Sequence, residues 1–196
     1  MSFSVCWYDS VSGKNGGRGV SKAQWLERGL QALSVGGVSA LTIEGLARSL
    51  GIARAGFYWH FKGRDDLLKQ LLDHWIAETT AVVTADERLL ALDPKARLAR
   101  AAERIVDHDL GRYEMAIRQW ALAEAQVMRA VRKVNRLRLE FARGAFGELG
   151  FTGDELEMRT MLFVCYHAWE ASTFRELSRK QRRALIENRI ELLTRQ

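Results

Sequence analysis

The sequence contains very little proline and cysteine. Its 196 residues include one proline, Pro94, and two cysteines, Cys6 and Cys165. Because proline interrupts helix interiors and marks irregular loops, its near-absence favours long, uninterrupted helices. Two cysteines are too few for a disulfide framework or for a four-cysteine zinc site.

Long hydrophobic runs are missing as well. No stretch approaches the 18 apolar residues that a membrane-spanning helix needs. Residues 1–9 contain neither a basic region nor a long apolar segment, so we expect no signal peptide. Together with the low cysteine content, these features predict a reduced, cytoplasmic protein with no membrane partner.

The composition is that of a folded domain with a mild excess of positive charge. Hydrophobic residues make up 47% of the chain and charged residues 28%, the formal net charge is +6, and the isoelectric point is about 9.6. Residues 1–75 and residues 76–196 each carry a net charge of +3. The charge therefore permits a nucleic-acid partner without indicating where such a partner would bind.

Glycines near the start of the chain predict a flexible arm over residues 1–19. Four of them lie between Gly13 and Gly19. Two interpretations stay open: a disordered tail, or a basic arm whose Lys14 and Arg18 reach a minor groove of DNA.

Helix-start and helix-stop signals follow one another along the rest of the chain. Capping boxes are expected at Ser21, Thr152 and Ser178, and Asp93 before Pro94 is a further helix start. Glycines end the expected helices, and a weak break is expected within residues 123–126. Because no hairpin signal or useful alternating run is present, we predict an all-α fold of about nine helices.

Residues 42–64 have the pattern of a helix-turn-helix. Thr42 can cap a first short helix, Gly51 can provide the turn, and a second helix begins at about Ala53. Arg54 lies early in this second helix, and arginine can donate two hydrogen bonds to one guanine. The pattern alone is weak, because many helical hairpins share it.

The surrounding residues make the resemblance specific. The segment from Leu41 to Leu68 resembles the DNA-binding domain of the TetR (tetracycline-repressor) family of transcriptional regulators. The resemblance rests on Leu50-Gly51-Ile52, on the run from Phe57 to Lys62, and on the run from Arg64 to Leu68. It covers about residues 20–72, whereas the rest of the chain matches the family only in length and helical character.

The resemblance assigns a role to each matching residue. Thr42 is implied to touch a phosphate, Arg54, Ala55 and Gly56 occupy base-contacting positions, and Tyr58 and His60 resemble a phosphate-contacting pair with Trp59 between them. Lys62 and Arg64 are implied to lie near the DNA backbone. Ala53 and Gly63 depart from the serine or threonine that is usual in the family, and each departure weakens capping by about 1 kcal/mol or less.

The C-terminal part carries two candidate interface helices. Residues 161–169 are apolar almost all round a helix, so that helix must be buried on more than one side. The final helix carries a second apolar stripe. The family dimerises through two such helices from each chain, and the candidate interface residues are therefore Phe163, Tyr166, Leu185, Ile186, Ile190 and Leu193.

The sequence thus predicts three regions: an arm over 1–19, a DNA-binding domain over 20–72, and an effector-binding and dimerisation domain over 73–196. Trp120 and Trp169 are the candidate effector contacts, although tryptophan at such positions is more often core. No cofactor or metal site is expected, and without a nucleophile–base pair an enzyme is a remote alternative.

The interpretation that we favour is a homodimeric regulator that binds a palindromic operator. It is expected to be a repressor that a small apolar effector releases from DNA. The alternative is a DNA-binding dimer without an effector, whose C-terminal domain is a scaffold or a site for a protein partner.

Overall fold

The computed structural model describes residues 19–84, 87–174 and 176–195. The arm expected over residues 1–19, with Lys14 and Arg18, lies outside this part of the chain apart from Gly19, so both interpretations of it stay open.

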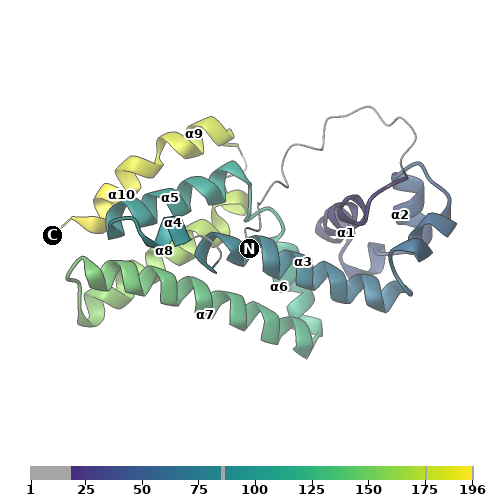
Figure 1. Ribbon diagram of the computed structural model, residues 1–196, viewed down its shortest axis with the longest axis horizontal. Coiled ribbons are helices and arrows are strands. Elements are labelled where there is room, and N and C mark those ends of the chain that lie inside the picture. Colours follow the sequence, from purple (N-terminus) through teal and green to yellow (C-terminus); the bar gives the residue numbers. More distant parts are fainter. Residues whose placement is uncertain (1–18, 85–86, 175, 196) are drawn as a thin grey trace.

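The N-terminal end of the fold is a cluster of short helices (Figure 1). It consists of α1 (Lys22–Gly36), a 3-10 helix η1 (Val38–Ala40), α2 (Ile43–Ser49) and a second 3-10 helix η2 (Arg54–Trp59). The long helix α3 (Arg64–Thr84) then runs from this cluster towards the rest of the molecule.

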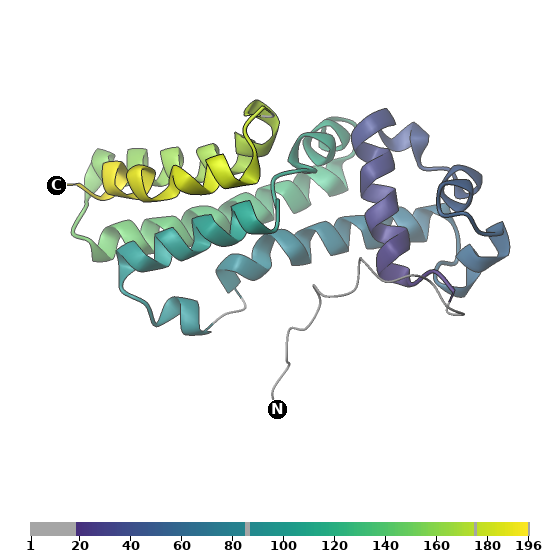
Figure 2. The same ribbon diagram turned by 90° about the horizontal axis from the view of Figure 1, so that it is seen from above.

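The C-terminal part is a bundle of long and short helices. Its elements are α4 (Glu87–Leu90), α5 (Pro94–Asp107), α6 (Glu114–Ala123), α7 (Ala125–Glu148), α8 (Gly153–Thr173), α9 (Arg179–Ala184) and α10 (Ile186–Thr194). Seen from above, α1 crosses the long helices of this bundle at a steep angle (Figure 2). The residues described here contain no strand, which confirms the all-α prediction, with ten α-helices where about nine were expected.

Most of the expected helix boundaries are confirmed. Ser21 and Ser178 form complete capping boxes, and Asp93 accepts from Ala96 N–H at 3.1 Å at the start of α5. The break between α6 and α7 falls at Glu124, whose ψ of 115° is extended. The capping box expected at Thr152 is wrong, because its side chain makes no capping hydrogen bond.

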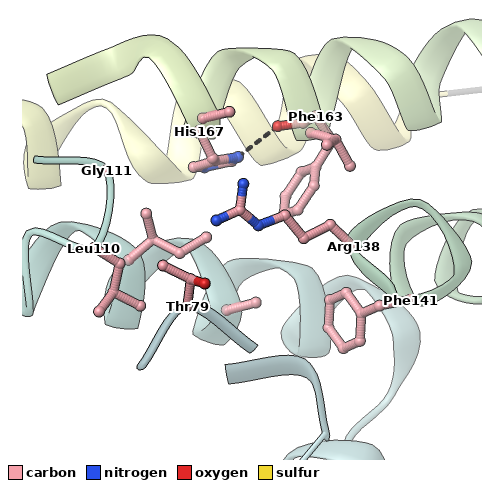
Figure 3. Close-up of a pocket in the computed structure, with 11 residues that line it drawn as sticks. Thr79, Leu110, Gly111, Arg138, Phe141, Phe163 and His167 are labelled. Atoms are coloured by element: carbon pink, nitrogen blue, oxygen red, sulfur yellow. Dashed lines mark hydrogen bonds between the residues drawn. The ribbon is translucent and has the colours of Figure 1, made fainter. Parts of the chain in front are cut away.

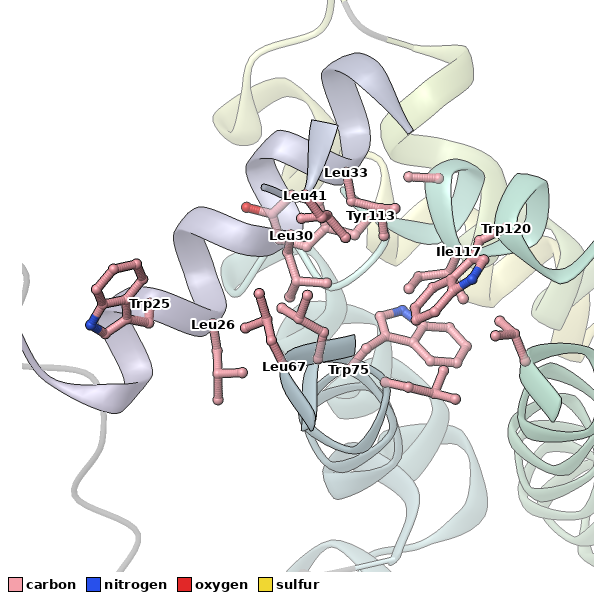
Figure 4. Close-up of a cluster of buried hydrophobic side chains, with 14 of the residues drawn as sticks. Trp25, Leu26, Leu30, Leu33, Leu41, Leu67, Trp75, Tyr113, Ile117 and Trp120 are labelled. Atoms are coloured by element: carbon pink, nitrogen blue, oxygen red, sulfur yellow. The ribbon is translucent and has the colours of Figure 1, made fainter. Parts of the chain in front are cut away.

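One hydrophobic core joins the N-terminal cluster to the bundle. Leu30 on α1, Leu67 and Trp75 on α3, and Ile117 and Trp120 on α6 pack in a continuous cluster (Figure 4). The domain boundary that we expected between residues 72 and 73 lies within α3, which therefore contributes to both regions. A movement of α6 can thus reach the N-terminal helices through direct packing.

A second core lies within the C-terminal bundle. It is built by side chains of α5, α7, α8 and α10, including Leu98, Phe146, Phe163 and Ile190. No helix in the described part of the chain is long and apolar enough to span a membrane.

Candidate DNA-binding site

A sharp turn sets α2 against η2. The Thr42 hydroxyl oxygen accepts a hydrogen bond from the Gly45 N–H at 3.1 Å, which caps α2 as predicted. Gly51 has a φ of 70°, a conformation that favours glycine because it has no Cβ. The Ile52 N–H then donates to the Ala47 carbonyl at 3.1 Å, so the chain folds back directly after α2.

Buried aromatic rings hold η2 in place. Phe57 is fully buried, and its ring centroid lies 5.4 Å from that of Trp25 and 5.0 Å from that of Phe61. These contacts place Phe57 and Phe61 in the core. Because one side of η2 is anchored in this way, the remaining residues of η2 must face outward.

The outward face of η2 carries two exposed aromatic residues. Tyr58 is 54% exposed and Trp59 is 87% exposed. Ala55 is exposed as well, and a Cβ added at Gly56 would lie 3.4 Å from Ile52 Cδ1. Two small residues, Ala55 and Gly56, thus precede two large exposed ones, Tyr58 and Trp59, on η2.

Arg54 lies at the start of this face and is paired with an acidic residue. Its Nη1 donates to Glu44 Oε1 at 2.9 Å. The two side chains are 61% and 60% exposed. This hydrogen bond raises the pKa of Arg54 and lowers the pKa of Glu44, so both groups are charged at neutral pH.

His60 and Arg64 make internal contacts. His60 Nε2 lies 2.9 Å from the carbonyl oxygen of Val20. Arg64 donates from Nε to the Leu41 carbonyl at 2.9 Å and from Nη2 to the Val38 carbonyl at 2.8 Å. The structure thus gives both side chains a role in holding the domain together, where the resemblance implied phosphate contacts.

Lys62 is exposed beside them. Its backbone N–H donates to Asp66 Oδ2 at 2.8 Å, which closes the turn before α3. The exposed surface of the helix-turn-helix therefore presents three cationic side chains, together with Tyr58 and Trp59; they are Arg48, Arg54 and Lys62. Such a set can contact phosphates and the edges of bases.

Sequence comparison identifies this segment. Residues 25–71 match the family described as bacterial regulatory proteins, tetR family. The N-terminal domain of this chain belongs to the tetR family. This match covers the whole helix-turn-helix described above. Among curated proteins, none matches the sequence.

Solved structures show that the same fold extends over most of the chain. A transcriptional regulator from Rhodococcus sp. Rha1 has 16% identity and a TM-score of 0.65, covering 89% of this chain and 96% of that one. The TetR-family regulator PfmR from Thermus thermophilus has 17% identity and a TM-score of 0.67, covering 87% and 97%. FadR from Bacillus subtilis, solved with stearoyl-CoA, has 16% identity and a TM-score of 0.61, covering 89% and 98%.

The C-terminal bundle contains a small cavity. Mostly apolar side chains line it, with Arg138 and His167 as the charged or titratable members (Figure 3). Its volume is about 30 Å³, which corresponds to about two water molecules. This cavity is therefore too small for a drug-sized effector.

Neither candidate effector contact lines this cavity. Trp120 is buried in the core between α1, α3 and α6. Trp169 lies on the surface of α8, where the guanidinium of Arg118 covers its ring at 5.4 Å. Trp120 is thus a core residue. Trp169 lies at the surface because the inward side of α8 is occupied by Phe163 and His167.

Charged groups beside the cavity are paired or held neutral. Arg138 Nη2 lies 3.2 Å from the fully buried Glu114, which also accepts from Arg118. His167 Nδ1 donates to the Phe163 carbonyl at 2.7 Å (Figure 3). Burial, followed by the nearby Arg189, lowers the pKa of His167 to about 3, so its imidazole is neutral at physiological pH.

Four of the six expected interface residues lie inside the chain. Phe163, Ile186, Ile190 and Leu193 are buried within the second core, so the structure leaves them no surface for a partner. Tyr166 is half-buried beneath the guanidinium of Arg189, at 4.0 Å. Leu185 alone of the six is clearly exposed.

A different apolar stripe faces outward on α8. Leu162 is 52% exposed whereas its neighbour Phe163 is 3% exposed. The spacing of the exposed residues places them on one face of the helix. They are Met158, Met161, Leu162, Cys165 and Trp169, and on the adjacent α10 segment Leu185 and Leu192 are exposed as well.

The contacts that join the cavity to α1 were not among the sites predicted from the sequence. Leu110 and Gly111 line the cavity. The next two residues bind Glu27 on α1: Arg112 Nη2 donates at 2.9 Å and the Tyr113 hydroxyl at 2.6 Å. No local pattern could have indicated them, because 85 residues or more separate the partners in the chain.

Proposed function

We propose that the protein is a homodimeric repressor whose η2 helices enter successive major grooves of a palindromic operator. This proposal rests on the outward face of η2. Arg54, Tyr58 and Trp59 are exposed there, while Phe57 anchors η2 in the core. Arg54 is suited to a guanine, and small side chains at Ala55 and Gly56 permit a close approach to the bases.

Other residues of the motif would hold the DNA backbone. Thr42 and Lys62 would contact phosphates, together with Tyr58 and Trp59 at the groove edge. His60 and Arg64 would act mainly by fixing the domain, because their side chains already bind backbone carbonyls.

The test begins with a duplex selected by the full-length protein from a random library. Affinity for this operator and for a scrambled duplex is then measured at several salt concentrations. Arg54→Ala should weaken operator binding by about 5- to 150-fold and scrambled binding much less. Lys62→Ala should weaken both duplexes equally and reduce the salt dependence by about one unit. Equal losses on both duplexes for Arg54→Ala would contradict base recognition by Arg54.

The exposed stripe on α8 supports dimerisation, with a second copy of the chain as its occupant. Two copies related by a two-fold axis would bring the same apolar faces together, which removes them from water. The family's dimers use the corresponding helices, which makes this occupant the natural one.

Substitutions on the stripe test the dimer. Met161→Asp and Leu162→Asp should give monomers in light scattering, because an unpaired charge in an apolar interface is costly. Met115→Asp is a matched control, since Met115 on α6 is exposed to a similar extent but lies off the stripe. A monomeric wild type at micromolar concentration would contradict the proposal.

A small apolar effector is a second proposal, and the loop between α5 and α6 favours it. This loop touches the cavity through Leu110 and Gly111 and touches α1 through Arg112 and Tyr113. A ligand that opened the cavity would push the loop and so change the position of α1. The structure of FadR with stearoyl-CoA supports a ligand role for a fold of this type.

This coupling can be tested without knowing the effector. A Cβ at Gly111 would lie 3.3 Å from Ala171 Cβ and 3.4 Å from the His167 carbonyl, so Gly111→Ala should press the loop away from α8. We expect a several-fold change in operator affinity that disappears in a Glu27→Gln background. Gly144→Ala is the control, because nothing lies within 4 Å of its added Cβ. If Gly111→Ala and Gly144→Ala bind the operator alike, the C-terminal domain is a scaffold.

A further inference from the structure

Glu44 places a negative charge on the surface that we propose binds DNA. It is the one acidic residue among residues 42–64, which otherwise carry Arg48, Arg54, Lys62 and Arg64. Its side chain is 60% exposed, in the first turn of α2. A carboxylate at such a place repels phosphates and lowers the affinity for any duplex.

The position of Glu44 is explained by its partner. Its Oε1 accepts from Arg54 Nη1 at 2.9 Å, across the turn between α2 and η2. Arginine has five N–H donors, and this hydrogen bond uses one of them. The other donors of the exposed guanidinium remain available for a guanine.

Stability does not account for this pair. Ion pairs between exposed side chains contribute little to folding, because water screens the attraction and both side chains lose conformational freedom. A favourable interaction of Glu44 with the N-terminus of α2 would not require Arg54 at all. What distinguishes this pair is that the Glu44 carboxylate holds Arg54, the side chain that is predicted to contact a base.

We propose that Glu44 is a positioning residue that sets operator specificity through Arg54. This inference rests on the proposed reading of DNA by η2. On random DNA, Glu44 opposes the capture of Arg54 by a phosphate and so weakens non-specific binding. On the operator, Glu44 keeps its hydrogen bond to Nη1 and aims the remaining donors at a guanine, so specific binding is retained.

The experiment compares two substitutions that remove the same charge. Glu44→Ala is paired with Asp65→Ala, because both residues are exposed and each is the second residue of its helix. Affinities for the selected operator and for a scrambled duplex are measured with the full-length protein. Asp65→Ala should strengthen both alike. Glu44→Ala should strengthen scrambled binding more, so that the operator-to-scrambled ratio falls by about three- to tenfold.

A double-mutant cycle shows whether Glu44 acts through Arg54. In an Arg54→Ala background, Glu44→Ala should leave the operator-to-scrambled ratio unchanged. In an otherwise wild-type chain, Glu44→Asp should have a higher ratio than Glu44→Ala, because aspartate retains the carboxylate. Equal ratios for Glu44→Ala and Asp65→Ala would overturn the proposal. A further fall in the Arg54→Ala background would also overturn it, since Glu44 would then contact a base itself.

If η2 does not recognise DNA as proposed, the same variants give a different result. If Arg54→Ala binds the operator as tightly as the wild type, η2 does not read DNA through Arg54. If Arg54→Ala loses the operator but Glu44→Ala keeps the full ratio, the reading function stands and the role of Glu44 is wrong. Thermal unfolding of each variant, with Glu44→Gln as a milder substitution, separates these outcomes from loss of fold.

Discussion

The Tyr113 hydroxyl donates a hydrogen bond of 2.6 Å to Glu27 Oε1 and thereby joins the start of α6 to α1. Arg112 binds the other oxygen of the same carboxylate at 2.9 Å. Beside this link, Asp109 has a φ of 48°, which is uncommon outside glycine, and it is held by Arg182 at 3.0 Å. The segment between α5 and α6 is thus tied to α1 and α9 at once.

Removal of the Tyr113 hydroxyl should destabilise the chain. Tyr113→Phe leaves Glu27 with one fewer donor in a partly buried place, and we expect a loss of about 1–3 kcal/mol in urea unfolding. The loss should be smaller in a Glu27→Gln background, because the hydrogen bond to a charged acceptor is already gone. Additive losses would show that the two side chains do not interact.

The raised pKa of Tyr113 predicts that the fold is less stable in alkali. Burial, followed by the hydrogen bond to Glu27, raises the pKa of Tyr113 above its ordinary value. The unfolded chain therefore releases this proton first, and stability falls as the pH rises above about 10. Urea unfolding between pH 9 and pH 11 should show a steeper fall for the wild type than for Tyr113→Phe.

His167 predicts a loss of stability in mild acid. Its pKa is lowered to about 3 in the folded chain, whereas an unfolded histidine titrates near 6.5. Below about pH 6.5 the unfolded state binds the proton, so stability should fall by about 1.4 kcal/mol per pH unit as the pH drops towards 3. His167→Asn, which retains a donor for the Phe163 carbonyl, should flatten this dependence. His74→Asn on α3 is the control, and an equal effect of both variants would contradict the assignment.

Glu114 should contribute strongly to stability, although it lies on α6, away from the helix-turn-helix. Its carboxylate is fully buried and pairs with Arg118 and Arg138. Glu114→Gln leaves two guanidinium groups without their counter-charge, and we expect a loss of about 3–5 kcal/mol. Glu157→Gln breaks an exposed pair with Arg143 and should leave the unfolding midpoint almost unchanged. Similar midpoints for the two variants would count against the buried network.

Arg64→Lys separates a structural role from a DNA contact. The guanidinium of Arg64 reaches two carbonyls, those of Leu41 and Val38, with two different nitrogens. Lysine keeps the charge that a phosphate needs but cannot reproduce this fork. We therefore expect a lower melting temperature with little change in the salt dependence of DNA binding. Unchanged melting together with weaker binding would assign Arg64 to the phosphate backbone.

The sequence alone determined those features that depend on neighbouring residues. Capping at Ser21, Thr42 and Ser178, the start at Asp93, and the break near Glu124 follow from side chains that act within one helical turn. The helix-turn-helix could be recognised for the same reason, since its turn, its anchor Phe57 and its exposed Trp59 lie within a few residues.

The tertiary structure alone decided which side of each helix meets the rest of the molecule. In the apolar run from residue 161 to 169, composition does not distinguish Phe163 from Leu162, yet packing against α7 and α10 buries the first and exposes the second. Arg64, Glu114 and Glu27 find partners 23 to 86 residues away. Such contacts depend on the relative positions of whole helices, which are set by long-range packing and leave no periodic signal in the sequence.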